Sequence, residues 1–197
     1  MNIQNVHIHL GHSGAIGAAM LAALVAGTTP EAQAEPKASS NILVPPAIGE
    51  YWKGQGGIYA GVGRGHDSPD YCLILPIDPR AIFVKRMLGT YGIEVPNASS
   101  DHDGMANTVA LADAGSDLCK EILALEIEGH KDFYLMSRTD ARLCWANVPE
   151  QFKKEWYLTS TQCSALTAWI QDFINGYQHY NTKKFEASAR ACRRLFL

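Results

Sequence analysis

EWYLTSTQCSALTAWIQDFINGYQHYNTKKFEASARACRRL, residues 155–195, combines two kinds of residue. One kind is a skeleton of Trp, Gln, Gly, Lys and Arg, which is typical of polar β-structure and turns. The other is a scatter of Cys, Leu, Thr, Ile, Tyr, His and Phe placed between the skeleton residues. Such hydrophobic residues either face the core or form an exposed apolar surface, and an exposed apolar surface usually marks a partner site. We therefore expect strands here and treat the scattered positions as candidate contacts.

The size and charge of the chain set limits on its class. Its 197 residues are enough for one main domain. Charged residues make up 19% and the net charge is −3, so the basic field that nucleic-acid binding needs is missing. The five cysteines are an odd number without CxxC spacing, which argues against a zinc knuckle and against a closed disulfide framework. We expect buried or half-buried thiols and no nucleic-acid partner.

The first 47 residues read as a separate segment. Val6, Ile8 and Leu10 alternate with His7 and His9, which predicts a short strand. Residues 15–26, AIGAAMLAALVA, are apolar on every side but shorter than the roughly 20 residues that a membrane span requires. We therefore expect no membrane span here.

Two interpretations of this apolar run remain open. A secretory signal would explain the AQA triplet at 32–34, although no Lys or Arg precedes the run. We prefer a helix buried against other copies of the chain. His7 and His9 would point the same way and are weak candidates for a metal site in a symmetric assembly; surface histidines are the simpler interpretation, so we expect no metal.

Residues 28–47 are rich in Pro, Ala and Ser and predict a linker, so the domain boundary is expected near Ile48. The main domain would then cover residues 48–197. Within it, residues 49–75 have the glycine and aromatic pattern of a β-hairpin. Residues 101–129 predict two short helices that break near Gly115 and end at Gly129.

Residues 133–148 predict a strand followed by a helix. Phe133, Tyr134 and Leu135 are expected to be extended, and Ser137 with Asp140 three residues later forms a capping-box pattern before a helix that ends at Pro149. Asp101, His102 and Asp103 suggest a catalytic or metal group, but acidic residues ahead of a helix more often cap it. The chain has no GxSxG, GxGxxG or P-loop motif. We expect no enzyme activity and no cofactor.

Four separated motifs carry a family resemblance: GEYWKGQGGIYAGV, HDGMANTVAL, GHKDFYLMSRTDARLCWANVPEQF and the stretch quoted first. With these, residues 49–197 resemble a family of phage, prophage and bacterial surface domains with a C-type-lectin-like fold. The family is related to the C-terminal domain of the Legionella collagen-like adhesin and to the variable proteins of diversity-generating retroelements. Met136, where Pro is expected, and Leu158, where an aromatic residue is expected, depart from its pattern. The resemblance implies an α+β fold, with a small mixed sheet, two or three short helices and an exposed ligand-binding face.

The resemblance also implies an origin for the scattered residues. In retroelement-diversified members, template adenines are miscopied, so AAC or AAT codons become codons for many residues but never for Lys, Glu, Gln, Met or Trp. The scattered side chains within residues 163–188 are of types that miscopied AAC or AAT codons can encode, which we call the reachable set. Most skeleton residues do not belong to it. Trp169 and Phe173 are expected in the core. The predicted ligand contacts are Cys163, Leu166, Thr167, Ile170, Ile174, Asn175, Tyr177, His179, Tyr180, Thr182, Phe185 and Ser188.

Three function classes follow. The preferred hypothesis is a phage or prophage tail-tip protein that binds a protein or glycan on the host surface, assembles as a homotrimer and contacts other tail or surface proteins. Its location would be the virion tail or the bacterial cell surface. The second is an oxidase similar to formylglycine-generating enzymes, with Cys163 and Cys192 as candidate thiols, although nothing near them in sequence would lower a thiol pKa. The third is a purely structural virion or cell-surface protein.

Overall fold

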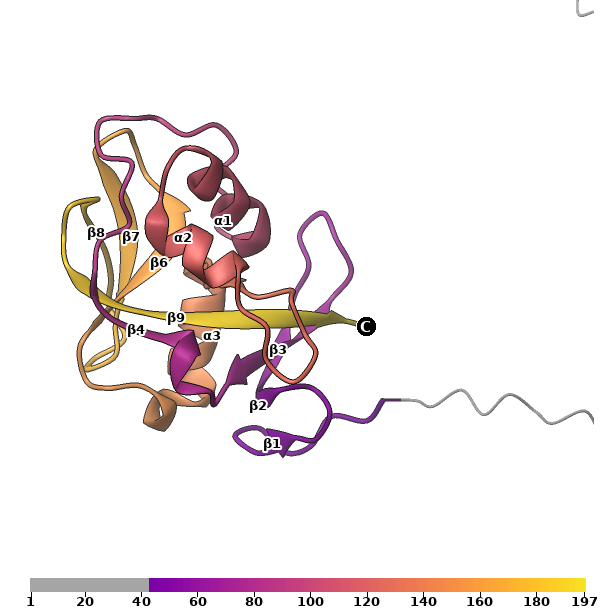
Figure 1. Cartoon of the computed structure of the whole chain (residues 1–197). Helices are drawn as coiled ribbons and strands as arrows, with labels where there is room; N and C mark the ends of the chain where they lie inside the picture. The colour runs from indigo at the N-terminus through magenta and orange to yellow at the C-terminus, as the bar shows by residue number, and fades with distance from the viewer. Residues whose placement is uncertain (1–42) are drawn as a thin grey trace, which may run out of the picture. The chain divides into compact units, whose positions relative to one another are not determined.

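The computed structural model describes residues 43–197, and these residues form a mixed α+β unit. Its β-sheet has the strand order β1-β2-β3-β9-β6-β7-β8, and β4 and β5 also pair with β9 (Figure 1). The strands are β1 (Tyr51–Trp52), β2 (Gly57–Gly63), β3 (Tyr71–Pro76), β4 (Ile82–Arg86), β5 (Tyr134–Leu135), β6 (Trp156–Gln162), β7 (Thr167–Asp172), β8 (Gln178–Thr182) and β9 (Ala187–Phe196). The helices are α1 (Gly104–Asp113), α2 (Asp117–Leu123) and α3 (Arg138–Asn147), with 3-10 turns at Pro79–Ala81 and Pro149–Gln151.

Strand β9 organises the sheet. It pairs antiparallel with β3, β4 and β5 and makes a parallel contact with β6 at Tyr157 and Ser188. Figure 1 shows it as one long strand that crosses the unit. The C-terminal segment of the chain therefore joins the N-terminal hairpin to the strands that carry the predicted contacts.

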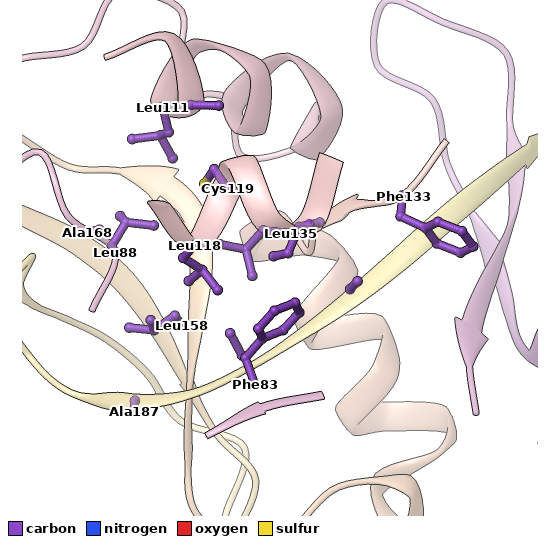
Figure 2. Packing of buried hydrophobic residues seen from close by; sticks show 14 of the residues in the cluster. Phe83, Leu88, Leu111, Leu118, Cys119, Phe133, Leu135, Leu158, Ala168 and Ala187 are labelled. Carbon is purple, nitrogen blue, oxygen red and sulfur yellow. The ribbon is translucent and has the colours of Figure 1, made fainter. Parts of the chain in front are cut away.

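Three apolar clusters fill the interior, and two of them are large. In the larger one, Leu111 of α1, Leu118 of α2, and Leu158 and Ala187 of the strands point toward one another (Figure 2). The smaller of these two joins α3 to β2 and β3 and includes Phe173, directly after β7. The third cluster lies between β1, β2 and β3. No helix among residues 43–197 has the length and apolar character that crossing a membrane requires.

Most of the expected local structure is present. The glycine-rich segment forms the β2–β3 hairpin, and α1 and α2 are separated at Gly115, whose φ is +105°. Asp103 caps α1 by accepting a hydrogen bond from the Ala106 N–H, as predicted. Ser137 and Asp140 form the predicted capping box at the start of α3. The expected α+β class with three short helices is therefore confirmed.

The predicted end of the second helix at Gly129 is wrong. Helix α2 ends at Leu123, and Ile127 pairs with His130 across a tight turn. Glu128 and Gly129 occupy this turn with φ values of +50° and +80°. Gly129 therefore supplies a left-handed turn conformation and is not a helix cap.

A buried polar network connects α3 with β3 and β9. Asp140 is fully buried, and its carboxylate accepts hydrogen bonds from Tyr71 Oη at 2.6 Å and from Ser137 N at 3.0 Å. Arg194 pairs with Asp140 at 3.2 Å and donates from Nε to Tyr134 Oη at 2.7 Å. Burial and the nearby Asp140 carboxylate raise the pKa of both Tyr71 and Tyr134 well above the ordinary tyrosine value.

We predict that ionisation of the Tyr71 and Tyr134 phenols destabilises the fold at high pH. Because their pKa values are raised in the folded state, their stabilising contribution is intact below about pH 10, the pKa of a tyrosine in the unfolded chain, and is lost as the pH rises above it. Above this pH the free energy of unfolding falls with a slope that approaches about 1.4 kcal/mol per pH unit for each tyrosine. Tyr71→Phe should lower the free energy of unfolding at pH 7 by about 1.5–3 kcal/mol, because Asp140 loses a donor, and should reduce the loss above pH 10.

The measurement is urea unfolding at pH 7, 9 and 10.5, with Tyr91→Phe, an exposed position, as the control. The control should follow the wild-type pH curve. Equal pH slopes for wild type and Tyr71→Phe would contradict the assignment.

Candidate ligand-binding surface on strands β7 and β8

Strands β7 and β8 form an antiparallel ribbon at the edge of the sheet. Trp169 lies opposite Tyr180, and Ile170 lies opposite His179. Because side chains alternate along a strand, these two pairs lie on opposite faces of the ribbon. The structure therefore divides the predicted contacts between two faces and the turns at the ribbon ends.

Ten of the twelve predicted contacts are exposed or half-exposed, and nine of these lie on β7, on β8 or in the turns at the two ends of β7. We call these nine the β7–β8 surface: Cys163, Leu166, Thr167, Ile174, Asn175, Tyr177, His179, Tyr180 and Thr182. Four of them are large hydrophobic residues with high exposed fractions: 48% for Leu166, 62% for Ile174, 70% for Tyr177 and 54% for Tyr180. Leu166 precedes β7 and Ile174 follows it, so these four side chains are spread along the ribbon. Exposed aromatic and aliphatic side chains of this kind are typical of partner-binding surfaces.

Three predicted contacts lie elsewhere. Ile170 is only 4% exposed and packs in the larger apolar cluster, and Phe185 packs against the same cluster. Ser188 is also 4% exposed, and its Oγ donates to Glu155 at 2.6 Å. The structure contradicts the prediction that Ile170 and Ser188 are surface contacts, because strand pairing turns both side chains inward.

Trp169 is half-buried beside the surface and is not a core residue, so that prediction is wrong. The Arg138 guanidinium stacks on its ring 3.5 Å from the centroid, and Tyr180 meets it edge-on at 6.0 Å. Arg138 is oriented by an ion pair with Asp101 at 3.0 Å and a hydrogen bond to Gln178 Oε1 at 3.0 Å. This stack connects the start of α3 to both strands of the ribbon. Phe173 does lie in the core, as predicted.

The turn between β7 and β8 has little freedom. Asp172 Oδ1 accepts from the Ile174 N–H at 2.8 Å, and Asn175 Oδ1 accepts from the Tyr177 N–H at 3.0 Å. Gly176 has a φ of +82°, and a Cβ there would lie 2.5 Å from the Trp145 ring. Ile174 and Tyr177 are therefore presented on a backbone that is already fixed.

Lys183 anchors the turn between β8 and β9. Its side chain is buried, and Nζ donates to Ile93 O at 2.7 Å and to Gln162 Oε1 at 2.6 Å. Gln162 in turn donates to Val95 O at 3.1 Å. Burial lowers the pKa of Lys183. The residues on either side of Lys183 are thus exposed, while the buried Lys183 side chain fixes the turn.

The outer edge of β8 is covered by its own side chains. His179 Nδ1 accepts from the Tyr180 N–H at 2.8 Å, and Asn181 Oδ1 accepts from the Thr182 N–H at 2.8 Å. Local partners for these N–H groups reduce the tendency of an edge strand to pair with another sheet. The β7–β8 surface therefore offers side chains for contact rather than an open backbone edge.

A polar cleft of about 430 Å³ lies between the β2–β3 turn and the segment before α1, and it was missed from the sequence. Its walls are the β2–β3 turn, residues 64–68, and the segment 97–103, and Arg194 also lines it. The His66 and His102 rings stack across it with centroids 4.9 Å apart. Asp101, on the same segment, holds Arg138. The polar turn was visible in the sequence, but only the fold brings the second wall against it.

A more apolar groove of about 660 Å³ lies beside the β7–β8 turn. Trp145, Phe152, Phe173 and Ile174 line it. Ile174 therefore connects this groove to the β7–β8 surface.

The cysteines and the predicted metal ligands add no reactive centre among residues 43–197. Four thiols are buried, as expected, and Cys163 is exposed. Burial raises the pKa of Cys119 to about 12, and burial also raises the pKa of Cys163 and Cys192. No group of three His, Cys, Asp or Glu side chains in this range is arranged to hold a metal. His7 and His9 lie outside the described residues.

No family model and no curated protein sequence matches this chain.

We predict that Lys183→Met lowers the free energy of unfolding by about 2–4 kcal/mol, because it leaves the Ile93 carbonyl and the Gln162 side chain without their buried donor. Urea unfolding at pH 7 measures this. Lys53→Met, at an exposed lysine, is the matched control and should change stability by less than about 0.5 kcal/mol. Equal effects of the two substitutions would show that Lys183 does not anchor the turn.

Proposed function

We propose that this chain is a ligand-binding module with a C-type-lectin-like fold. It would act at a phage or prophage tail tip or on a bacterial cell surface and bind a host-surface protein or glycan through the β7–β8 surface. The observation that carries the proposal is the set of four exposed hydrophobic side chains, Leu166, Ile174, Tyr177 and Tyr180, on a ribbon whose turns are fixed by buried polar contacts.

The geometry of this surface favours recognition over catalysis. Tyr177 and Tyr180 offer large rigid areas with a polar tip, which suits contact residues that must bind at low entropy cost. A few such anchors usually carry most of the binding energy of an interface. Because Gly176 and Lys183 hold the backbone in place, little ordering is left to oppose binding.

The distribution of residue types supports diversification of this surface by a retroelement. All nine residues of the β7–β8 surface belong to the set that miscopied AAC or AAT codons can reach. Four of the residues that brace the ribbon, Trp169, Gln171, Gln178 and Lys183, lie outside that set, whereas Asp172 and Gly176 lie within it. Such a division would let the exposed residues change while the supporting contacts stay the same.

Two rival functions remain, each with a discriminating feature. An oxidase similar to formylglycine-generating enzymes would need an activated thiol, whereas burial raises the pKa of Cys163. A purely structural virion protein would not need the exposed hydrophobic group. We propose that the chain has no catalytic role, and that assembly with other copies, as a homotrimer, uses residues 1–47.

Sequencing the DNA downstream of the gene tests the diversification. We expect a near-identical copy of the final hundred or so bases, with AAC or AAT at the codons for Tyr177, His179 and Tyr180, followed by a reverse-transcriptase gene. If no such copy exists near the gene, the scatter of residues arose by ordinary divergence and the retroelement proposal fails.

A cell-binding experiment tests recognition itself. Fluorescently labelled full-length chain is titrated onto intact cells of a panel of bacterial strains and measured by flow cytometry. We predict that the double substitution Tyr177→Ser and Tyr180→Ser weakens binding to a recognised strain at least tenfold, because each anchor contributes about 1–2 kcal/mol.

The matched control is Tyr51→Ser with Val62→Ser, which removes two exposed side chains of β1 and β2, outside the β7–β8 surface. It should retain wild-type affinity. Equal losses in the two double variants would contradict the proposed binding surface.

A further inference from the structure

The polar cleft between the β2–β3 turn and the segment before α1 has the size of a small-molecule site. Its volume of about 430 Å³ falls within the range of roughly 300–1,000 Å³ that is usual for such sites. A water-sized atom takes up about 30 Å³, so the cleft has room for about a dozen non-hydrogen atoms. None of the residues of the β7–β8 surface lines it.

Hydrogen bonds hold both walls of the cleft. In the β2–β3 turn, Asp70 Oδ1 accepts from the Gly65 N–H at 2.9 Å. On the other side, Ser100 Oγ accepts from the Asp103 N–H at 2.8 Å, and Asn107 Nδ2 donates to Ser100 O at 2.7 Å. The cleft is therefore formed before any ligand enters, as is usual for small-molecule sites.

The charges that line the cleft cancel. Arg64 and Arg194 are its cations, Asp67 and Asp103 are its anions, and the other lining residues carry no formal charge when histidine is neutral. The buried Asp140 carboxylate lies 3.2 Å from Arg194 and offsets the charge of this arginine further. The cleft therefore favours a neutral ligand over an anion or a cation, and its many polar side chains favour a polar ligand over an apolar one.

Hydrogen-bond donors and acceptors lie close together in the cleft. Arg194 donates from Nε and Nη2, whereas its Nη1 has no hydrogen bond to a described residue and is not among their buried unpaired atoms. This Nη1 lies 3.9 Å from Asp103 Oδ1, which is too far for a hydrogen bond. A hydroxyl group both donates and accepts, so it can bind the two residues at once. A carboxylate at Arg194 would be repelled by Asp103, and an ammonium at Asp103 would be repelled by Arg194, so a zwitterion fits poorly.

The opposite wall repeats this mixture of donors and acceptors. His66 and Asp67 are exposed and line the cleft, and the His66 ring stacks on His102 with the centroids 4.9 Å apart. A neutral imidazole offers one donor and one acceptor nitrogen, and a carboxylate offers acceptors only. Hydroxyl groups on a ligand can therefore bind to both walls.

We propose that this cleft binds one neutral sugar unit, whose hydroxyl groups bridge Arg194 and Asp103 on one wall and reach His66 and Asp67 on the other. A pyranose unit has about a dozen non-hydrogen atoms and carries adjacent hydroxyls, so it matches the volume, the balanced charge and the paired donors and acceptors. The site is separate from the β7–β8 surface and does not depend on the function proposed for that surface.

Saturation-transfer-difference NMR on the full chain tests the site. The probes are the methyl glycosides of glucose, galactose, mannose and N-acetylglucosamine. We expect at least one of them to bind with a Kd in the low millimolar range. Glucuronate and glucosamine, which carry a negative and a positive charge, should bind at least threefold more weakly than the best neutral glycoside. Absence of binding by every neutral glycoside, or stronger binding of a charged sugar, would overturn the proposal.

Variants locate the bound sugar. The double substitution His66→Phe and Asp67→Ala changes two exposed positions and keeps an aromatic ring beside His102. It should weaken sugar binding at least fivefold, because it removes hydrogen-bonding groups from one wall. Tyr177→Ser with Tyr180→Ser is the control and should retain the wild-type Kd for the sugar, because neither tyrosine lines the cleft.

The two double variants also separate this proposal from the proposed function. Sugar binding that is lost only in the tyrosine variant would place the sugar on the β7–β8 surface and overturn the cleft site, while leaving the proposed function intact. An unchanged Kd in the His66 and Asp67 variant would likewise contradict the cleft site.

Discussion

The buried carboxylate of Asp140 is the contact on which the rest of the structure depends. It closes the capping box of α3, accepts a hydrogen bond from Tyr71 of β3, and pairs with Arg194 of β9. A single side chain thus fixes where α3 begins relative to two strands of the sheet. This placement of α3 also positions a surface residue. Arg138, the first residue of α3, stacks on Trp169 and donates a hydrogen bond to Gln178. Removing one partner of such a buried pair leaves an uncompensated charge, which is far more costly than losing a surface contact.

The candidate binding surface rests on polar contacts and close packing beneath it. Asp172, Gly176 and Lys183 fix the two turns that flank β8 through hydrogen bonds and close packing, and the buried Phe173 adds apolar contacts in the first turn. The exposed residues between these positions make few contacts with the interior and so have little influence on folding. A surface of this kind can change its side chains while its backbone remains the same, which is what the proposed function requires.

The sequence predicted those features that depend on residues near one another. The Ser137–Asp140 capping box, the Asp103 cap and the β2–β3 hairpin are local patterns, and each is present. Gly129 was misinterpreted because glycine serves helix ends and tight turns equally well. Trp169, Ile170 and Ser188 were misplaced because burial on β7 and β9 is set by pairing between strands and by α3. The polar cleft could not be predicted, since its walls come from segments that are distant in sequence.

We infer that the side chains of the β7–β8 surface contribute little to folding stability, whereas the residues that fix its backbone contribute much. Two displayed libraries measure this directly: one randomises Leu166, Ile174, Tyr177, Tyr180 and Thr182, and the other randomises Asp140, Gln162, Asp172, Gly176 and Lys183. Both are scored for folding by resistance to protease. The account predicts that most members of the first library fold as well as the wild type and that few members of the second do. Comparable losses of folded protein in the two libraries would contradict it.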